Sequence, residues 1–197
     1  MHSQTSHAPR WPGTIRQLRP SDFQRFQDHL LRLDAASRRD RFNGLTDDEF
    51  VAAYALRSFT DGTTVIGYVE DDQVLGAAEL HERPEEAMPT AEIAFSVEKS
   101  LQHRGIGSAL FERLIIHALG LGYTRLCVTT HPENEGMKAL ARKFEARLSF
   151  EAGEAVGVIE LPETLPQFVP VWPGTETVVP PVLLKQAVRI ETDATET

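Results

Sequence analysis

One segment of the chain combines residue types that could bind a phosphate group. It reads Gln102-His103-Arg104-Gly105-Ile106-Gly107-Ser108 and lies between a strand-like run and an amphipathic, helix-like run. Because Gly105 and Gly107 carry no Cβ atoms, successive backbone N–H groups can approach an anion at the positive end of a helix. The segment therefore predicts a site for the diphosphate of a nucleotide-bearing cofactor.

Two other classes of nucleotide site fit this segment poorly. The Gly-x-Gly-x-x-Gly fingerprint of dinucleotide-binding folds is not matched, and no acidic residue ends a next strand about twenty residues later. The chain also lacks the Gly-Lys-Ser/Thr of a phosphate-binding P-loop. A glycine-rich turn without a ligand is the alternative that the pattern alone leaves open.

The elements before this segment follow from hydrophobic periodicity and from capping residues. Ser21 and Gln24 form a capping box that begins a first helix, and the dipeptide Asp71-Asp72 is a turn that joins two strands into a hairpin. Strands are expected at 14–18, 63–70, 73–81 and 90–97, and helices are expected to begin at Ser21 and Thr46.

The elements after the segment complete an alternating order of helices and strands. Apolar residues recur at helical spacing from Ile106, and Gly120 marks the end of that helix. The remaining elements are a strand at 125–130, a helix headed by Asn134, and a closing hairpin of 147–151 with 155–161.

The two ends of the chain differ from its middle. Residues 1–12 show no periodicity, which predicts a mobile arm. Prolines crowd the stretch from Pro162 to Pro181 and exclude a central strand or helix over most of its length. We therefore expect an N-terminal arm at 1–12, one domain at 13–161 and a proline-rich C-terminal tail at 162–197.

Composition limits the functional classes. The chain has 197 residues, 41% of them hydrophobic, which suits a single core. Its net charge is −9, and it has no run of Lys or Arg that could neutralise a nucleic acid, so no nucleic-acid partner is expected. Because Cys127 is the only cysteine, no internal disulfide can form. No apolar stretch suggests a membrane span or a secretory signal, so we expect a cytoplasmic protein without a membrane partner.

The element order and the signature Gln102-x-x-Gly105-x-Gly107 resemble the Gcn5-related N-acetyltransferase (GNAT) superfamily, over about residues 14–161. The segment from Leu33 to Phe42 and the run Asn134-x-x-Met137-x-x-Leu140-Ala141 look like the acetyltransferase domains of bacterial protein-lysine acetyltransferases. The resemblance implies an α+β fold. Its mixed, mostly antiparallel sheet of six to seven strands would splay at the centre and be flanked by about four helices.

The resemblance also implies acetyl-CoA as the cosubstrate, with no metal. In the family, the amides of the glycine loop hold the pyrophosphate, and the preceding strand pairs with the pantetheine arm. An opened sheet edge can satisfy the pantetheine amides in this way. Asn134 could contact the cofactor, cap its helix, or do both. The implied cofactor contacts are Phe95, Val97, Gln102, His103, Arg104, Gly105, Ile106, Gly107, Ser108, Asn134 and Met137.

Acetyl transfer to an amine requires removal of a proton, because a lysine-type amine has a pKa of about 10.4. Glu92 interrupts an otherwise apolar strand and matches a glutamate that often serves as base in the family, so it is the candidate general base. Glu79 and His81 are alternative bases, and Glu92 could instead be solvated or ion-paired. The backbone N–H of Val97 is the expected oxyanion donor.

Two positions depart from the family pattern. Ala141 stands where many members carry a tyrosine that protonates the departing thiolate, and Glu145-Ala146 replaces an expected Gly-Phe. Both departures leave the general acid unassigned. A thiol with a pKa of about 8.5 is a competent leaving group near neutral pH, so a dedicated acid is not essential.

These observations predict an acetyl-CoA-dependent N-acetyltransferase that acts on a primary amine, either a protein lysine or a small molecule. A non-catalytic acyl-CoA-binding sensor is the alternative, suggested by the missing tyrosine and the proline-rich tail. Use of a longer acyl-CoA is also open. The resemblance is compatible with a homodimer, although no sequence feature demonstrates one.

Overall fold

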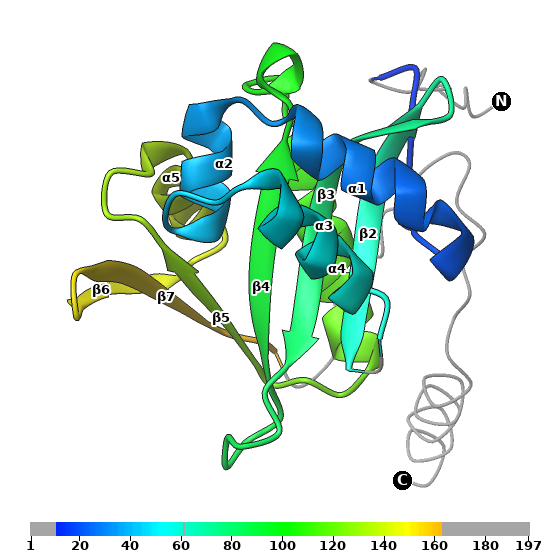
Figure 1. Cartoon of the computed structure of the whole chain (residues 1–197). Helices are drawn as coiled ribbons and strands as arrows, with labels where there is room; N and C mark the ends of the chain where they lie inside the picture. The colour runs from blue at the N-terminus through cyan, green and yellow to red at the C-terminus, as the bar shows by residue number, and fades with distance from the viewer. Residues whose placement is uncertain (1–10, 61, 163–197) are drawn as a thin grey trace, which may run out of the picture.

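A seven-stranded sheet organises residues 11–60 and 62–162, the part of the chain that the computed structural model describes. The strand order is β1-β2-β3-β4-β5-β7-β6 (Figure 1). The strands are β1 (Thr14–Gln17), β2 (Thr63–Glu70), β3 (Gln73–Glu82), β4 (Thr90–Val97), β5 (Arg125–Thr130), β6 (Arg147–Glu151) and β7 (Glu154–Glu160).

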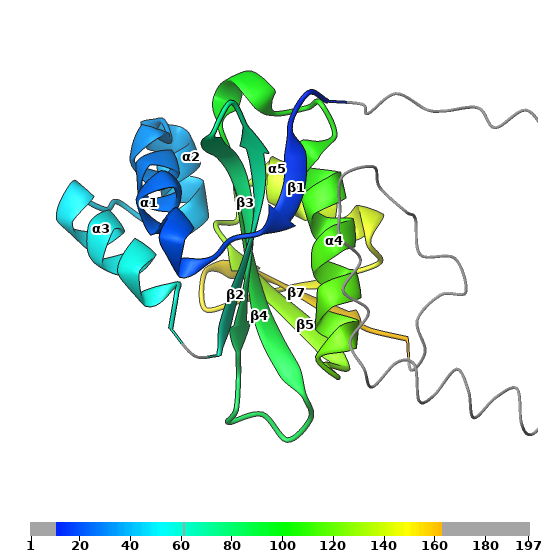
Figure 2. The same ribbon diagram turned by 90° about the vertical axis from the view of Figure 1, so that its right-hand side faces the viewer.

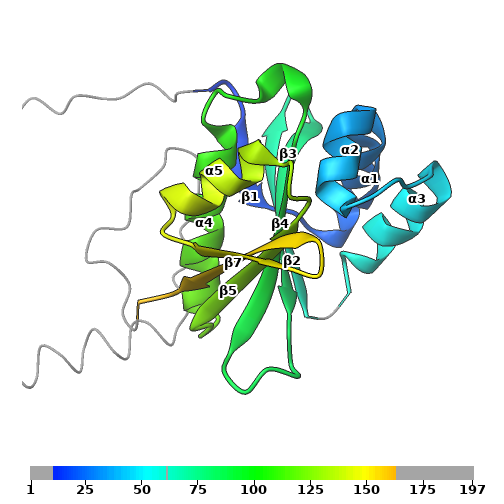
Figure 3. The same ribbon diagram turned by 90° about the vertical axis from the view of Figure 1, so that its left-hand side faces the viewer.

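Helices cover both faces of this sheet. α1, α2 and α3 lie on one face, and α4 and α5 lie on the other (Figures 2 and 3). The helices are α1 (Phe23–Arg32), α2 (Ala35–Phe42), α3 (Asp48–Arg57), α4 (Ile106–Gly120) and α5 (Glu135–Lys143), with short 3-10 turns at Pro20–Asp22 and Lys99–Leu101. No helix in the described ranges is long and apolar enough to cross a membrane.

The expected fold class is confirmed. All sheet pairings are antiparallel except the one between β4 and β5, which is parallel. The predicted hairpin forms through Asp71 and Asp72, whose φ angles of 48° and 60° suit a tight turn between twisted strands. The expected arm at 1–12 and tail at 162–197 lie almost entirely outside the described residues.

Helix α2 is the element that sequence reasoning missed. Its N-cap, Asp34, accepts a hydrogen bond from the Ser37 N–H at 2.8 Å, and Asn43 ends the helix at a φ of 54°. None of its residues is fully buried, so it has no apolar stripe to predict it. A second correction concerns α3, which is capped by Asp47 and begins at Asp48 rather than opening at Thr46.

The centre of the sheet opens between β4 and β5. These strands pair at Thr90–Arg125, Ala91–Leu126 and Glu92–Cys127, and the pairing stops there. Beyond that register β4 continues to Val97 and β5 to Thr130, and the two ribbons separate towards the end where α2 and α5 lie (Figure 1). This is the central splay that the family resemblance implied.

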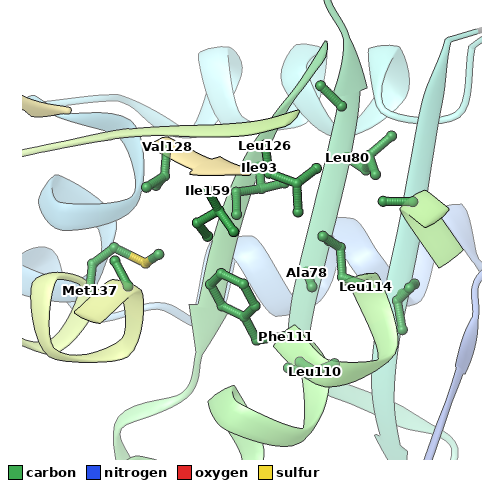
Figure 4. Packing of buried hydrophobic residues seen from close by; sticks show 14 of the residues in the cluster. Ala78, Leu80, Ile93, Leu110, Phe111, Leu114, Leu126, Val128, Met137 and Ile159 are labelled. Carbon is green, nitrogen blue, oxygen red and sulfur yellow. The ribbon is translucent and has the colours of Figure 1, made fainter. Parts of the chain in front are cut away.

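The core beneath α4 fixes the position of this opening. Leu110, Phe111 and Leu114 are fully buried and pack on Leu80 and Ile93 of the sheet (Figure 4). Each such side chain contributes roughly 1.5–3 kcal/mol of burial free energy. The ring of Phe111 also stacks between those of Phe95 and Phe144, at centroid distances of 4.8 and 4.2 Å. The start of α4 is thereby held beside the parted end of β4.

A second core lies on the opposite face, under α1 and α3. Phe26 and Leu30 of α1 and Val51 and Ala55 of α3 are fully buried, and they belong to one cluster with Ala77 of β3. This packing turns one side of α1 towards the sheet, and that side also carries His29.

Candidate functional site

A cleft of about 550 Å³ lies where β4 and β5 separate. Its walls come from the free ends of both strands, from α2, from the loop before α4 and from α5. Among the described residues, its lining is Asp34, Ala36, Ser37, Asp40, Arg41, Ala94, Phe95, Ser96, Val97, Lys99, Gln102, His103, Gly105, Gly107, Ser108, Val128, Thr129, Thr130, Asn134, Gly136, Met137, Ala139, Leu140 and Lys143.

The glycine segment forms the start of α4 and one wall of the cleft. Gly105 is the N-cap at a φ of 88°, a conformation that favours glycine. The N–H groups that follow, beginning with Ile106, have no acceptor within the helix, so they present an anion-binding helix end. A methyl group added to Gly107 would meet only Leu140 Cδ2, at 3.8 Å. Packing alone therefore does not demand glycine at 107, and its absent side chain leaves room for a ligand in the cleft.

The segment's other residues divide between the cleft and the core. His103, Gly105, Gly107 and Ser108 line the cleft. Ile106 instead is fully buried in the hydrophobic core. Arg104 is outside the lining among the described residues, and its backbone carbonyl accepts a hydrogen bond from Trp11 Nε1 at 3.1 Å.

Gln102 connects three parts of the site. Its Nε2 donates to the Val97 carbonyl at 3.0 Å and to Ser37 Oγ at 3.2 Å. The side chain therefore joins the end of β4, the glycine segment and α2. Sequence reasoning expected Gln102 to flank the phosphates, whereas its amide nitrogen here donates to protein acceptors.

The backbone N–H and C=O groups of the odd-numbered residues of β4 face the opening. The carbonyl of Thr90 accepts from the Arg83 N–H, and the N–H of Glu98 donates to the Leu75 carbonyl. The backbone polar groups of the even-numbered residues therefore face β3. Because backbone direction alternates along a strand, the polar groups of Phe95 and Val97 face the side that β5 has left. Both residues line the cleft, with the orientation needed to pair with an extended ligand.

Asn134 and Met137 form the wall at the head of α5. Asn134 Oδ1 accepts from the Met137 N–H at 2.9 Å, so Asn134 is the helix N-cap. Its Nδ2 donates to Thr130 Oγ1 at 2.9 Å, which attaches α5 to the end of β5. Asn134 and Met137 both line the cleft as well, so the capping role and a ligand contact are compatible.

Glu92, the candidate base, lies apart from these residues. It sits in the paired part of β4, opposite His81 and Cys127, and is outside the cleft lining among the described residues. Its carboxylate accepts a hydrogen bond from Arg83 Nη1 at 2.7 Å. This is the ion-paired arrangement that sequence reasoning left open. A catalytic role of Glu92 stays a prediction.

Glu79 is a buried anchor for a residue of the cleft. Its carboxylate forms an ion pair with Arg41 and accepts hydrogen bonds from Tyr54 at 2.8 Å and Ser58 at 3.1 Å. Burial alone would raise the pKa of Glu79, but Arg41 and His81 hold that pKa well below its usual value. Glu79 is therefore ionised and committed to Arg41, whose side chain reaches the cleft.

A serine, a histidine and a glutamate also meet beside the cleft. Ser96 Oγ lies 2.8 Å from His29 Nε2, and His29 Nδ1 lies 3.3 Å from Glu98 Oε1. Ser96 lines the cleft, whereas His29 is completely buried, and this burial lowers the pKa of His29. No sequence signal identifies this group, because only the packing of α1 on the sheet brings His29 to the other two residues.

Comparisons with known proteins agree with this geometry. The structure is similar to the GNAT domain of S. lividans PAT, with a TM-score of 0.66 and 20% identity over 76% of this chain and 90% of that one. It is also similar to the paia N-acetyltransferase from Thermoplasma acidophilum in complex with coenzyme A, with a TM-score of 0.58 and 13% identity, covering 76% and 99% of the two chains. A third similar structure is yncA, a putative acetyltransferase from Salmonella typhimurium with its cofactor acetyl-CoA, with a TM-score of 0.57 and 18% identity, covering 78% and 96%.

These structural similarities establish the fold, and the sequence establishes the family. A sequence model of the acetyltransferase (GNAT) family matches residues 21–145, which is more than half of the chain. This match includes β4, the glycine segment and the head of α5, the elements that form the cleft. The chain therefore belongs to the acetyltransferase (GNAT) family.

Proposed function

We propose that this chain is an N-acetyltransferase that binds acetyl-CoA in the cleft and transfers its acetyl group to a primary amine. The observation that carries the proposal is the meeting of an opened sheet edge with the N-terminus of α4 in one cleft. The similar structures from T. acidophilum and S. typhimurium contain coenzyme A and acetyl-CoA.

The cleft offers binding groups for two parts of this cosubstrate, its pyrophosphate and its pantetheine arm. The amides from Gly105 to Ser108 would hold the pyrophosphate, because a helix N-terminus binds anions through unpaired N–H groups. The exposed backbone edge at Phe95 and Val97 would pair with the pantetheine amides. With the Val97 carbonyl already bonded to Gln102, the Val97 N–H is the group proposed to stabilise the oxyanion.

The acceptor would enter beside α2, where the cleft carries two carboxylates. Asp34 and Asp40 both line it, and each side chain is about a third exposed. The charge of Arg41 on the same wall is compensated by Glu79. Lys99 and Lys143 also line the cleft, and Lys99 Nζ lies 3.4 Å from Asp34 Oδ2, so the lining carries both signs of charge. The proposal of a primary amine, of a protein lysine or of a small molecule, therefore rests on the family and not on the charge of the cleft.

The expected position of the general acid carries alanine, which has no ionisable side chain. Ala141 is 1% exposed and belongs to the core beneath α5. We propose that coenzyme A leaves as the thiolate, because a thiol with a pKa of about 8.5 needs little assistance near neutral pH.

Thiol release from acetyl-CoA tests the proposal. The intact protein is incubated with acetyl-CoA and a panel of amines that includes Nα-acetyl-lysine, a lysine peptide and spermidine, and acetylated products are identified by mass spectrometry. Release above hydrolysis with any of these amines supports the enzyme. Tight binding in calorimetry without release supports the sensor alternative instead, and absence of binding contradicts both. Propionyl-CoA and longer thioesters, run in parallel, report the acyl-chain preference.

A homodimer and a cytoplasmic location stay predictions.

A further inference from the structure

We propose that Ser96 is a catalytic residue that accepts the proton of the acceptor amine and passes its own hydroxyl proton to His29. This inference rests on the proposed acetyl transfer and offers a proton acceptor within the cleft lining, which among the described residues includes Ser96 and does not include Glu92. His29 acts through Ser96 and is a positioning residue, and Glu98 in turn orients His29.

Hydrogen bonding fixes the direction of this relay. Glu98 is an ionised carboxylate that also accepts from Arg32 Nε at 2.9 Å, so it can only accept from His29. The hydrogen of the neutral imidazole must then lie on Nδ1, facing Glu98 Oε1. Nε2 is left as an acceptor for the Ser96 hydroxyl, which is 2.8 Å away.

The relay of Ser96 and His29 lies beside the proposed site of acetyl transfer. Ser96 precedes Val97, whose N–H is the proposed oxyanion donor, and both residues line the cleft. Side chains alternate along a strand, so Ser96 projects towards α1 and α2, the side from which we expect the acceptor. Ser96 is 7% exposed and His29 is 0% exposed, so bulk water does not compete for the proton along this path.

The chemical step balances without another reactant. The neutral amine nitrogen attacks the thioester carbonyl carbon, a C–N bond forms, and the C–S bond breaks as coenzyme A leaves as the thiolate. The amine proton passes to Ser96 Oγ while the Ser96 hydroxyl proton passes to His29 Nε2. The imidazolium faces Glu98 until its proton returns through Ser96 to the thiolate or to water.

The charged groups around His29 suit this task. Glu98 beyond β4 and Glu79 on β3 favour the imidazolium, whereas burial and Arg32 on α1 itself favour the neutral ring. Burial therefore keeps His29 neutral before the reaction, and Glu98 stabilises it after proton uptake.

A second hydroxyl–imidazole pair in the same protein serves as a control for a purely structural role of Ser96 and His29. Thr64 Oγ1 and His117 Nε2 are 3.3 Å apart, on β2 and α4, and neither residue lines the cleft. Ser96→Ala and His29→Gln should therefore be compared with Thr64→Ala and His117→Gln. All four variants remove one half of a hydroxyl–imidazole pair.

The first experiment determines the tautomer of the resting protein and does not need turnover. Two-bond proton–nitrogen correlation spectra of the protein with ¹⁵N-labelled histidine distinguish a protonated Nδ1 from a protonated Nε2, and His29→Gln assigns the signals. We expect the hydrogen on Nδ1 and an unprotonated Nε2 before acetyl-CoA is added. A hydrogen on Nε2 would overturn the relay, whether or not acetyl transfer occurs.

The second experiment measures kcat and KM with acetyl-CoA and Nα-acetyl-lysine across a range of pH. General-base catalysis contributes roughly 10²–10⁴-fold, so Ser96→Ala should lower kcat by about 100-fold or more at neutral pH. Acetyl-CoA affinity in calorimetry should stay the same. The deficit should persist as pH rises, because Ser96 accepts the proton that leaves the nitrogen after its attack, whatever fraction of the free amine is neutral in solution. Ser96→Thr keeps the hydroxyl and should recover most of the lost turnover.

The double variant separates a relay from two independent contributions. Ser96→Ala and His29→Gln together should lower kcat no further than either alone, because members of one relay are not additive. Equal kcat losses in the Thr64 and His117 variants would overturn the inference, as would a loss of acetyl-CoA affinity without a loss of kcat. A kcat loss in Glu92→Gln together with normal turnover in Ser96→Ala would return the role to Glu92. Absence of turnover in the wild type would refute acetyl transfer itself. The tautomer of His29, measured without turnover, would still show which of the two residues donates in the Ser96–His29 hydrogen bond.

Discussion

Arg41 and Glu79 form a buried ion pair that holds one wall of the cleft. Their side chains are 6% and 0% exposed, and Tyr54 and Ser58 satisfy the remaining carboxylate oxygen. Removing one partner of such a pair is far more costly than the pair's net contribution, because the other charge stays buried. At this position stability and function are coupled, because the ion pair with Glu79 of β3 holds Arg41 at the wall of the cleft.

The first prediction concerns the carboxylate of this pair. Glu79→Gln should lower the free energy of unfolding by roughly 3–5 kcal/mol, because it leaves the charge of Arg41 without a counter-charge. The matched control is Asp48→Asn, which breaks the Arg38–Asp48 pair, where the Asp48 side chain is 78% exposed. That substitution should cost less than about 1 kcal/mol. Urea unfolding monitored by fluorescence measures both, and equal losses would contradict the assigned role of Glu79.

The second prediction is the pH dependence of the same carboxylate. Its neighbours lower the pKa of Glu79 from the usual 4.5 to about 2 in the folded state. A depressed folded-state pKa gives stability that is complete above the unfolded-state pKa and is lost as pH falls through the folded-state pKa. Wild-type stability should therefore fall between about pH 4.5 and 2 more steeply than that of Glu79→Gln. Parallel curves for the two proteins, measured by urea unfolding at each pH, would be inconsistent with this pKa shift.

At the scale of elements, the start of α4 combines two glycines that have different physical functions. Gly105 is required by backbone conformation, at a φ of 88°. Gly107 has an ordinary helical position, and an added methyl group would meet only Leu140 Cδ2 at 3.8 Å. The first glycine shapes the turn into the helix, and the second keeps the space in front of the helix open.

The third prediction separates these two functions by substitution. Gly105→Ala should destabilise the fold by roughly 1–2 kcal/mol, because an L-residue is strained in the left-handed region. Gly107→Val should change stability much less but should abolish binding of acetyl-CoA, since its branched side chain would fill the cradle. Thermal unfolding and calorimetry together provide the comparison. Normal acetyl-CoA binding by Gly107→Val would show that the ligand does not occupy this cradle.

Sequence patterns predicted the elements that bury a regular set of apolar residues and missed the helix that does not. The strand at 90–97, the helix from Ile106 and the turn at Asp71 have alternation, helical spacing or turn chemistry, and the structure contains all three. Helix α2 has no apolar stripe, so only its cap, Asp34, could have indicated it. Contacts such as Ser96 with His29 depend on the packing of α1 on the sheet, which local patterns do not encode.

At the scale of the whole molecule, the sheet is continuous at one end and parted at the other. β3 and β4 pair from Gly76–Val97 to Glu82–Ala91, and the hydrophobic cluster beneath α4 includes residues of both strands. Past Glu92–Cys127, β4 and β5 have no backbone pairing with each other. One hydrophobic cluster nevertheless includes Ile93 of β4 and Val128 of β5, so side chains join the two sides of the opening beneath α4. A ligand that pairs with the free edge would add backbone hydrogen bonds to this link.

The fourth prediction is an alternating pattern of amide exchange along β4. The N–H groups of Ala94 and Ser96 face β3 and should exchange slowly, whereas those of Phe95 and Val97 face the opening and should exchange fast. Acetyl-CoA at about 100 times its Kd should stabilise the fold by roughly 2.7 kcal/mol, and the protection it adds should concentrate at Phe95 and Val97. Residue-resolved hydrogen exchange with and without acetyl-CoA measures this pattern, and β2 provides the internal reference because both of its edges are paired. Uniform protection of all four β4 amides in the free protein would mean that the edge is closed. Protection that appears only at the start of α4 would mean that the cosubstrate binds through its phosphates without pairing to the strand.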